Sequence, residues 1–218
     1  MVQSDVIRYA LIAMKAGRND GVFSQDYQIG ITALGLNELA GAGVFTVDGD
    51  DKIRCQEEKH EIPEYLLPLE KTAMKENGKS FGSFLLSIFT GSIGEYERQI
   101  ENFMEKEKLI KILTEKNKLG IENRIIQVSP QYADECTSYI RDICLTNEIH
   151  TDKAPLIRIL MKTDMMTGIL DKNEIKGVKQ KLKNIFDTEA DDAACATLDM
   201  ADKTCVAAVS IIATMMLV

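Results

Sequence analysis

The sequence predicts a mainly α-helical single domain, a helical bundle with short β-hairpins, one of which protrudes. Apolar residues recur at helical spacing along most of the chain. Two short β-type runs flank a turn sequence, and the central segment 95–130 joins a helical pattern to a further β-type run. A chain of 218 residues that is 45% hydrophobic can bury one core. We therefore predict a single domain over residues 1–218.

The first third of the chain predicts two helices and a hairpin. Helical spacing of apolar residues covers 5–16 and 28–39. Two β-type runs follow, 44–47 and 52–55, on either side of the Asp-Gly-Asp turn at 48–50. We expect these runs to pair as the first hairpin.

The next segment predicts a helix that stops and a second helix that starts soon afterwards. The apolar face of 81–89 is followed by Gly91, a residue that commonly ends helices. Ser92 and Glu95 have the spacing of a capping box, in which each side chain bonds an amide at the start of a helix. The sequence therefore predicts a new helix at Ser92.

The central segment 95–130 predicts a helix, a glycine stop and a β-type run. After the charged run 105–108, the apolar pattern of 109–113 resumes on a different helical face, which indicates two helices or one helix between two packing surfaces. Asn117 and Gly120 are predicted to end that helix, and 124–128 is a β-type run. The unit is typical either of a recognition helix with a wing or of a helix that presents a protruding apolar hairpin.

The last third predicts more helices. One starts at Ser129-Pro130, one covers 153–170, and one follows the capping-box spacing of Asp171 and Glu174. The apolar stretch 205–218 is shorter than the roughly 20 residues of a spanning helix. We expect it to be a buried helix, with a membrane tail anchor as the alternative.

Composition excludes several classes of function. The formal net charge of −8 disfavours nucleic acid as a partner, because phosphate backbones repel an acidic chain. The five cysteines are odd in number and lack C-x-x-C spacing, which is typical of a reducing compartment. The N-terminus mixes charged and apolar residues, unlike a signal peptide. These features predict a cytoplasmic protein.

No motif predicts catalysis. Gly78-Lys79-Ser80 resembles the end of a phosphate-binding loop, but Ala73 occupies the position of its first glycine, so we expect a turn between helices. The two histidines, His60 and His150, lack partners at ligand spacing. We therefore predict that the protein is not an enzyme and holds no metal or cofactor.

The central segment leaves three interpretations open. A winged helix that reads DNA should be clearly positive, whereas 95–124 carries seven basic and seven acidic residues. The basic cluster 106–118, with Ile125 and Ile126 on the hairpin, could instead meet anionic lipid headgroups while the isoleucines insert into the membrane. The simplest interpretation is a solvated helix face with a hairpin packed on its own core, and spacing alone favours it.

Three stretches, in order and spacing, make the chain resemble the Golgi phosphoprotein 3 family. The segment 29–47 is similar to that family's glycine-led helix and strand, 99–130 to its central helix and protruding hairpin, and 153–185 to its late helix pair. The matching residues are Glu38, Leu39, Ala40, Gly43, Leu109, Lys111, Leu113, Glu115, Lys116, Leu156, Leu160 and Leu170.

This resemblance implies a peripheral membrane protein that binds phosphatidylinositol 4-phosphate and inserts its hairpin through Ile125 and Ile126. In eukaryotic members it also implies a Golgi location and binding to the cytosolic tails of glycosyltransferases. The family binds its lipid with a tryptophan and several arginines. The corresponding positions here are Phe23, Thr32, Phe103 and Lys106, of which Lys106 alone keeps a positive charge.

Two further functions compete with lipid binding. A protein of the same fold that has lost the lipid pocket would serve as a protein-interaction scaffold. A winged-helix regulator of DNA is the third, and the balanced charge of 95–124 argues against it.

Overall fold

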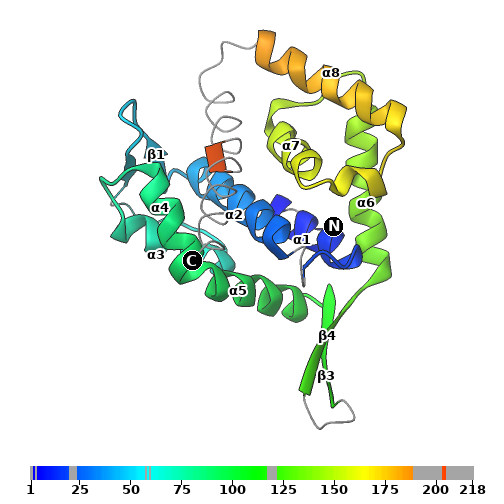
Figure 1. Ribbon diagram of the computed structural model, residues 1–218, viewed down its shortest axis with the longest axis horizontal. Helices are drawn as coiled ribbons and strands as arrows, with labels where there is room; N and C mark the ends of the chain where they lie inside the picture. The colour runs from blue at the N-terminus through cyan, green and yellow to red at the C-terminus, as the bar shows by residue number, and fades with distance from the viewer. Residues whose placement is uncertain are drawn as a thin grey trace, which may run out of the picture.

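The computed structural model describes residues 4–19, 24–56, 60–116 and 122–188, together with Val2, Glu58, Lys203 and Thr204 (Figure 1). It is a helical bundle with two antiparallel two-stranded hairpins, as the sequence predicts. Its α-helices and strands are α1 (Asp5–Lys15), α2 (Ser24–Gly41), β1 (Phe45–Val47), β2 (Ile53–Cys55), α3 (Leu67–Lys75), α4 (Phe81–Ser87), α5 (Ile93–Lys106), β3 (Ile110–Lys116), β4 (Glu122–Val128), α6 (Pro130–Leu145), α7 (Ala154–Lys162) and α8 (Lys172–Thr188).

Helix α2 lies at the centre of the bundle, where α1, α3, α5 and α7 contact it (Figure 1). It is apolar around most of its circumference, which is the pattern of a helix enclosed by its neighbours. Two glycines permit close approach of aromatic side chains: a Cβ atom added at Gly30 would lie 2.1 Å from Tyr9, and one at Gly35 would lie 2.2 Å from the Tyr96 hydroxyl. That hydroxyl donates to the carbonyl of Ile31 over 3.0 Å. The close packing of Tyr9 and Tyr96 against α2 therefore requires glycine at positions 30 and 35.

The first hairpin is confirmed. Strands β1 and β2 pair with Phe45 opposite Cys55, and the carboxylate of Asp48 accepts hydrogen bonds from the amides of Asp50 and Lys52 in the turn. Gly78, at φ +83°, lies in the turn between α3 and α4, and Ser80 caps α4. The segment that resembles a phosphate-binding loop is therefore a helix-to-helix turn, as expected.

Helix α5 begins at Ile93 with Ser92 as its N-cap residue, as predicted, but the predicted capping box and the helix stop at Gly91 are wrong. Helix α4 continues through a π-helical turn, Ile88–Ser92, directly into α5. The Ser92 side chain caps no amide and instead accepts a hydrogen bond from the Thr72 hydroxyl. Because the π turn satisfies the backbone groups that a helix end would expose, neither Gly91 nor Ser92 interrupts the helix.

The predicted helix over 109–113 is also wrong, because this segment is a strand. Helix α5 ends at Lys106, and Lys108 adopts a left-handed conformation at φ +59°. The amide of Leu109 donates to the carbonyl of Met104 and that of Lys108 to Glu105, the paired bonds of a Schellman motif. The buried side chains of Leu109 and Met104 complete the motif. The chain then leaves the helix axis and forms β3.

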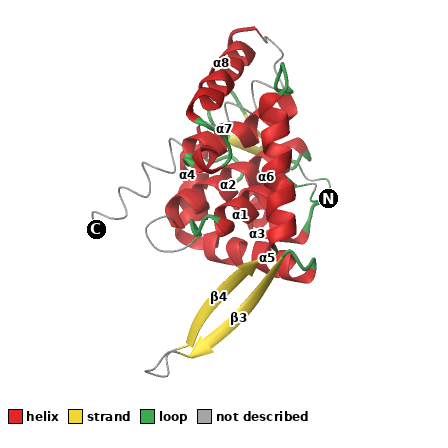
Figure 2. Ribbon diagram, turned by 90° about the vertical axis from the view of Figure 1, so that its right-hand side faces the viewer, coloured by secondary structure: helices red, strands yellow, loops and turns green. Residues whose placement is uncertain are grey.

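Strands β3 and β4 form a hairpin that extends away from the bundle, at the end opposite α8 (Figure 2). Its base lies against α5 and α1, and its far end has no helix beside it in either ribbon view (Figures 1 and 2). The prediction of one protruding hairpin is therefore confirmed.

The helix predicted over 153–170 is shorter than expected and is followed by a break. Helix α7 ends at Lys162, where Asp164 adopts a left-handed conformation and a short 3₁₀ turn, Met165–Gly168, follows. The predicted continuous helix over 153–170 is therefore wrong. The capping box at α8 is confirmed: Asp171 accepts from the amide of Glu174, and Glu174 accepts from the amide of Asp171.

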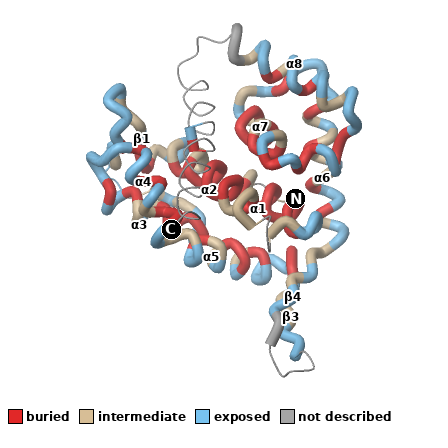
Figure 3. Tube along the Cα trace, viewed as in Figure 1, coloured by how far each residue is buried: buried red, intermediate tan, exposed pale blue. Residues whose placement is uncertain are grey.

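One hydrophobic cluster runs from α1 to α8, and the exposed residues lie on the outer faces of the helices and along the hairpin (Figure 3). In the part of the chain that the structure describes, the helices are too short or too polar to cross a membrane. The apolar stretch 205–218, predicted to be a buried helix, lies outside the described residues.

Candidate functional site

The pairing register divides the protruding hairpin into two faces. Ile110 lies opposite Val128, Ile112 opposite Ile126 and Leu113 opposite Ile125. Because side chains alternate along a strand, Ile125 and Ile126 point to opposite faces of the ribbon. The two isoleucines that the sequence predicted to insert together are thus separated.

The inner face packs against the bundle. Ile112, Ile126 and Val128 are partly buried and contact the core. Farther along this face, the guanidinium of Arg124 lies 2.5 Å from the carboxylate of Glu101 on α5. The amide of Ile112 also donates to the Glu105 carboxylate over 3.3 Å. These contacts hold the base of the hairpin in one orientation relative to α5.

The outer face joins apolar side chains to a basic one. Leu113 pairs with Ile125, which is 36% exposed, and Lys111 pairs with Gln127 one step nearer the bundle. The described residues beyond the apolar pair are mostly polar or charged, including Thr114, Glu115 and Lys116. End-on insertion would place those charges in hydrocarbon, at a cost of several kcal/mol. The outer face is therefore better suited to lie along a membrane surface.

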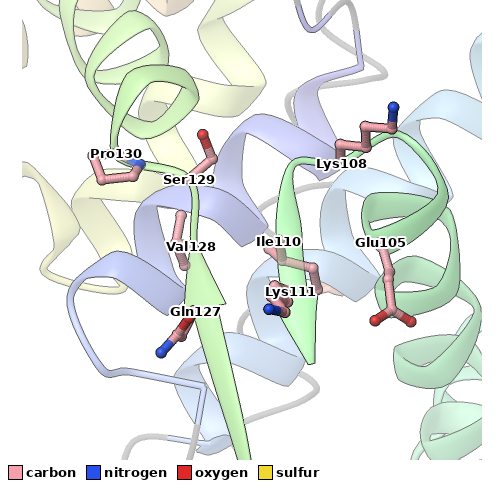
Figure 4. A pocket seen from close by; sticks show the side chains of 8 residues that line it. All are labelled: Glu105, Lys108, Ile110, Lys111, Gln127, Val128, Ser129 and Pro130. Carbon is pink, nitrogen blue, oxygen red and sulfur yellow. The ribbon is translucent and has the colours of Figure 1, made fainter. Parts of the chain in front are cut away.

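A shallow pocket of about 470 Å³ lies where this hairpin meets the bundle (Figure 4). Its lining comprises Glu105, Lys108, Ile110, Lys111, Gln127, Val128, Ser129 and Pro130. Lys108 comes from the turn after α5, Lys111 from β3, and Ser129 and Pro130 from the start of α6 (Figure 4). Two basic residues and a helix start thus line the hairpin base, with the two ammonium groups pointing in different directions (Figure 4).

The start of α6 adds a partial positive charge to this pocket. Ser129 is its N-cap, its side chain bonds no helix amide, and Pro130 occupies the first turn. Amides in the first turn of a helix lack helical acceptors, and the helix dipole favours an anion there. Glu105 is the one carboxylate among the described lining residues, and its oxygen accepts from the Ile112 amide.

The four residues matched to the family's lipid-binding positions have different environments. Phe23 lies outside the described residues. Thr32 is fully buried in α2, whereas Lys106 is exposed at the last turn of α5. Phe103 is half-buried and contacts the Tyr65 ring edge-on, with 5.1 Å between the centroids. Neither Thr32 nor Lys106 lines the pocket beside Phe103 or the pocket at the hairpin base.

The pocket beside Phe103 differs from a phosphate site. It is lined by Tyr65, Leu109, Tyr132 and the carboxylate of Glu107, with no basic side chain among its described lining residues. Behind it, the Tyr65 hydroxyl donates to the Glu38 carboxylate over 3.0 Å, and burial raises the pKa of Glu38. An anion would meet two acidic groups here, so the headgroup role of Phe103 remains a prediction that this geometry does not favour.

The sequence indicated the basic segment 106–118 without separating its lysines. The strand pairing distinguishes them, because it puts Lys111 on the same face as Leu113 and Ile125. The alternating pattern of 110–114 was the signal for a strand, and it is also compatible with a short helix. Ser129 carried no sequence signal beyond its place before a proline.

No family model matches the chain, and a search of curated proteins finds no match. The resemblance to the Golgi phosphoprotein 3 family therefore stays a prediction based on the residues quoted above.

Proposed function

We propose that this protein binds reversibly to anionic membranes through the outer face of its protruding hairpin. The observation that carries the proposal is an apolar pair, the half-buried Leu113 and the exposed Ile125, on the same face as Lys111. This combination of apolar and basic side chains is what interfacial membrane segments use. The hairpin stands clear of the bundle, so a flat surface can reach this face (Figure 2).

The expected affinity is modest. Burying one large aliphatic side chain contributes about 1.5–3 kcal/mol, and a lysine near an anionic membrane contributes about 1 kcal/mol. Two aliphatic side chains and two or three lysines together give binding that is easily reversed. The chain has a net charge of −8, whereas its segment 95–124 is balanced. An anionic membrane therefore repels the rest of the molecule, which favours approach by the hairpin end.

The pocket at the hairpin base is the proposed site for the phosphate of a phosphoinositide headgroup, with phosphatidylinositol 4-phosphate as the ligand that the resemblance suggests. Lys108 and Lys111 would neutralise the phosphate, and the first-turn amides of α6 would donate to it. Lys106, which is exposed in the last turn of α5, would add to the positive charge near the pocket. Golgi location and binding of glycosyltransferase tails are part of this proposal.

Vesicle flotation tests the proposal. We expect wild type to float with vesicles that contain phosphatidylinositol 4-phosphate and to remain unbound with neutral phosphatidylcholine. The double variant Leu113→Asp/Ile125→Asp should lose binding at least about tenfold, because each carboxylate replaces an apolar contact. Leu86→Asp/Leu145→Asp is the matched control, because these leucines are 46% and 48% exposed on other elements.

Two outcomes contradict the proposal. The first is equal flotation with anionic and neutral vesicles. The second is an equal loss of flotation in both double variants. A preference for phosphatidylinositol 4-phosphate over phosphatidylserine at matched charge would support the headgroup pocket specifically.

A second candidate is a scaffold of the same fold that binds a protein partner and no lipid. The observation that favours it is the acidic character of the pocket beside Phe103, in which Glu107 is the charged residue among the described lining residues. This candidate predicts no flotation of wild type with any vesicle, together with normal folding of the hairpin variants.

A further inference from the structure

We propose that the cleft between α7 and α8 is a second anion-binding site, which takes a ligand with phosphate groups. The cleft has a volume of about 490 Å³ and is lined by Arg158, Met161, Lys162, Lys179, Leu182 and Lys183. Four of these six side chains are cationic, and no carboxylate is among the described lining residues. The inference goes beyond the hairpin site and does not depend on it.

The arrangement of these cations follows from helical spacing. Arg158 and Lys162 are four residues apart on α7, and Lys179 and Lys183 are four residues apart on α8, so each pair shares one helix face. Met161 and the buried Leu182 contribute the apolar part of the cleft. Two basic pairs thus meet across one cleft.

Each basic pair places two like charges four residues apart on one helix, which is unfavourable for that helix taken alone. The two helices are basic although the chain as a whole is acidic at −8: α7 and α8 together carry seven basic and two acidic residues. A multivalent anion would convert this repulsion into attraction.

Two of the other charged residues on α8 have separate roles. The Lys181 ammonium donates to the carbonyls of Cys144 and Thr146 at the end of α6, and Glu174 pairs with Arg141. These contacts attach α8 to α6 and leave Lys179 and Lys183 on a different face, where both are exposed. Arg158 and Lys162 also take part in other polar or ionic contacts, so a ligand would share or displace those.

The chemistry of the cleft indicates the class of ligand. An arginine can bind a phosphate with two parallel hydrogen bonds, and lysines supply point charges around it. The volume suits a compact ligand with two phosphates or a phosphorylated sugar. Helix α8, which supplies Lys179 and Lys183 to the cleft, lies at the end of the molecule opposite the protruding hairpin (Figures 1 and 2). The cleft is therefore remote from the far end of the hairpin and can take a soluble ligand.

Thermal unfolding and calorimetry on the full chain test the site. The probes are inorganic pyrophosphate and the soluble headgroup glycerophosphoinositol 4-phosphate, each at about 1 mM, where affinities up to the millimolar range are detected. We expect at least one probe to raise the Tm of wild type. Lys179→Glu/Lys183→Glu should weaken that binding at least about tenfold. Its Tm without ligand should stay equal or rise, because the new carboxylates face Arg158 and Lys162.

The matched control is Lys71→Glu/Lys75→Glu, which makes the same charge change at the same spacing on the exposed face of α3. This control should bind the probes like wild type. No response of wild type to either probe would overturn the proposal, and so would an equal loss of binding in the control. If the charge reversal impairs folding, Lys179→Gln/Lys183→Gln gives the same comparison with a smaller change.

Two further comparisons identify the source of the phosphate and separate the two sites. Tighter binding of the inositol headgroup, together with weaker vesicle flotation of the cleft variant, would identify a lipid source. Tighter binding of pyrophosphate with unchanged flotation would identify a free ligand. Leu113→Asp/Ile125→Asp should keep probe binding, so failure of the hairpin proposal leaves the cleft result unaffected.

Discussion

Lys108 occupies a backbone position that glycine usually fills. Its φ of +59° lies in the left-handed region at the C-terminal end of α5. A residue with a Cβ atom pays about 1 kcal/mol or more for that conformation. The side chain lines the pocket at the hairpin base, which is where a positive charge serves the proposed function.

Replacement of Lys108 separates backbone strain from side-chain charge. We expect Lys108→Gly to be more stable than Lys108→Ala by about 1 kcal/mol in urea unfolding, because glycine removes the steric cost at positive φ. Both variants should lose flotation with anionic vesicles to the same extent, because both lack the ammonium group. Equal stability of the two variants would mean that the turn carries no strain, and unchanged flotation would remove Lys108 from the proposed site.

The hairpin is an element with two different faces. Ile126 is half-buried against the bundle, whereas Ile125 is exposed beside Leu113. The Arg124–Glu101 pair lies on the inner side, where α5 covers the strand. Adjacent residues of the same type therefore differ in what they contribute: Ile126 to stability and Ile125 to the proposed membrane contact.

Single aspartate substitutions should reveal this difference. We expect Ile126→Asp to lower the free energy of unfolding by about 1–2 kcal/mol, because it places a carboxylate against apolar side chains. Ile125→Asp should change stability by no more than about 0.5 kcal/mol, as exposed substitutions usually do. Urea denaturation of both variants measures this. The reverse order of effects would show that the strand pairs in a different register.

At the scale of the whole molecule, Glu38 ties together three segments. Its carboxylate accepts from the Ser4 hydroxyl over 2.7 Å, from the amides of Asp5 and Val6, and from the Tyr65 hydroxyl. A side chain of α2 thus supplies acceptors to the start of α1, the role that a local N-cap residue usually has. Burial outweighs these hydrogen bonds and raises the pKa of Glu38 above its ordinary value of 4.5.

This raised pKa makes a prediction about stability and pH. The folded protein holds the Glu38 proton more tightly than the unfolded chain, so the contribution of this group falls as pH rises from about 4.5 through the folded pKa. Glu38→Gln keeps an acceptor oxygen and removes the titration. We expect the stability of wild type minus that of the variant to decrease with pH over this range, as measured by urea unfolding. A difference that rises with pH would mean that the hydrogen bonds dominate and that the carboxylate is preferred in the fold.

The sequence determined those features of this protein that depend on local chemistry. Apolar spacing located α1, α2 and α6, Asp48 located the first turn, and the Asp171–Glu174 spacing located the start of α8. Each of these depends on groups within a few residues of one another, so the pattern along the chain contains the necessary information. The same holds for the fold class, which follows from the proportion of helical pattern.

The tertiary structure decided the features that depend on partners distant in the chain. The segment 110–116 is a strand because β4 pairs with it, and its pattern alone also fits a short helix. The residues Lys108, Lys111 and Ser129 meet in one pocket because a turn, a strand and a helix start converge there. The four cations of the α7–α8 cleft lie two on each helix. They line one cleft because the chain turns back between the helices, at Asp164 and the 3₁₀ turn after it. Strand pairing and helix packing bring such residues together through contacts that no local pattern encodes.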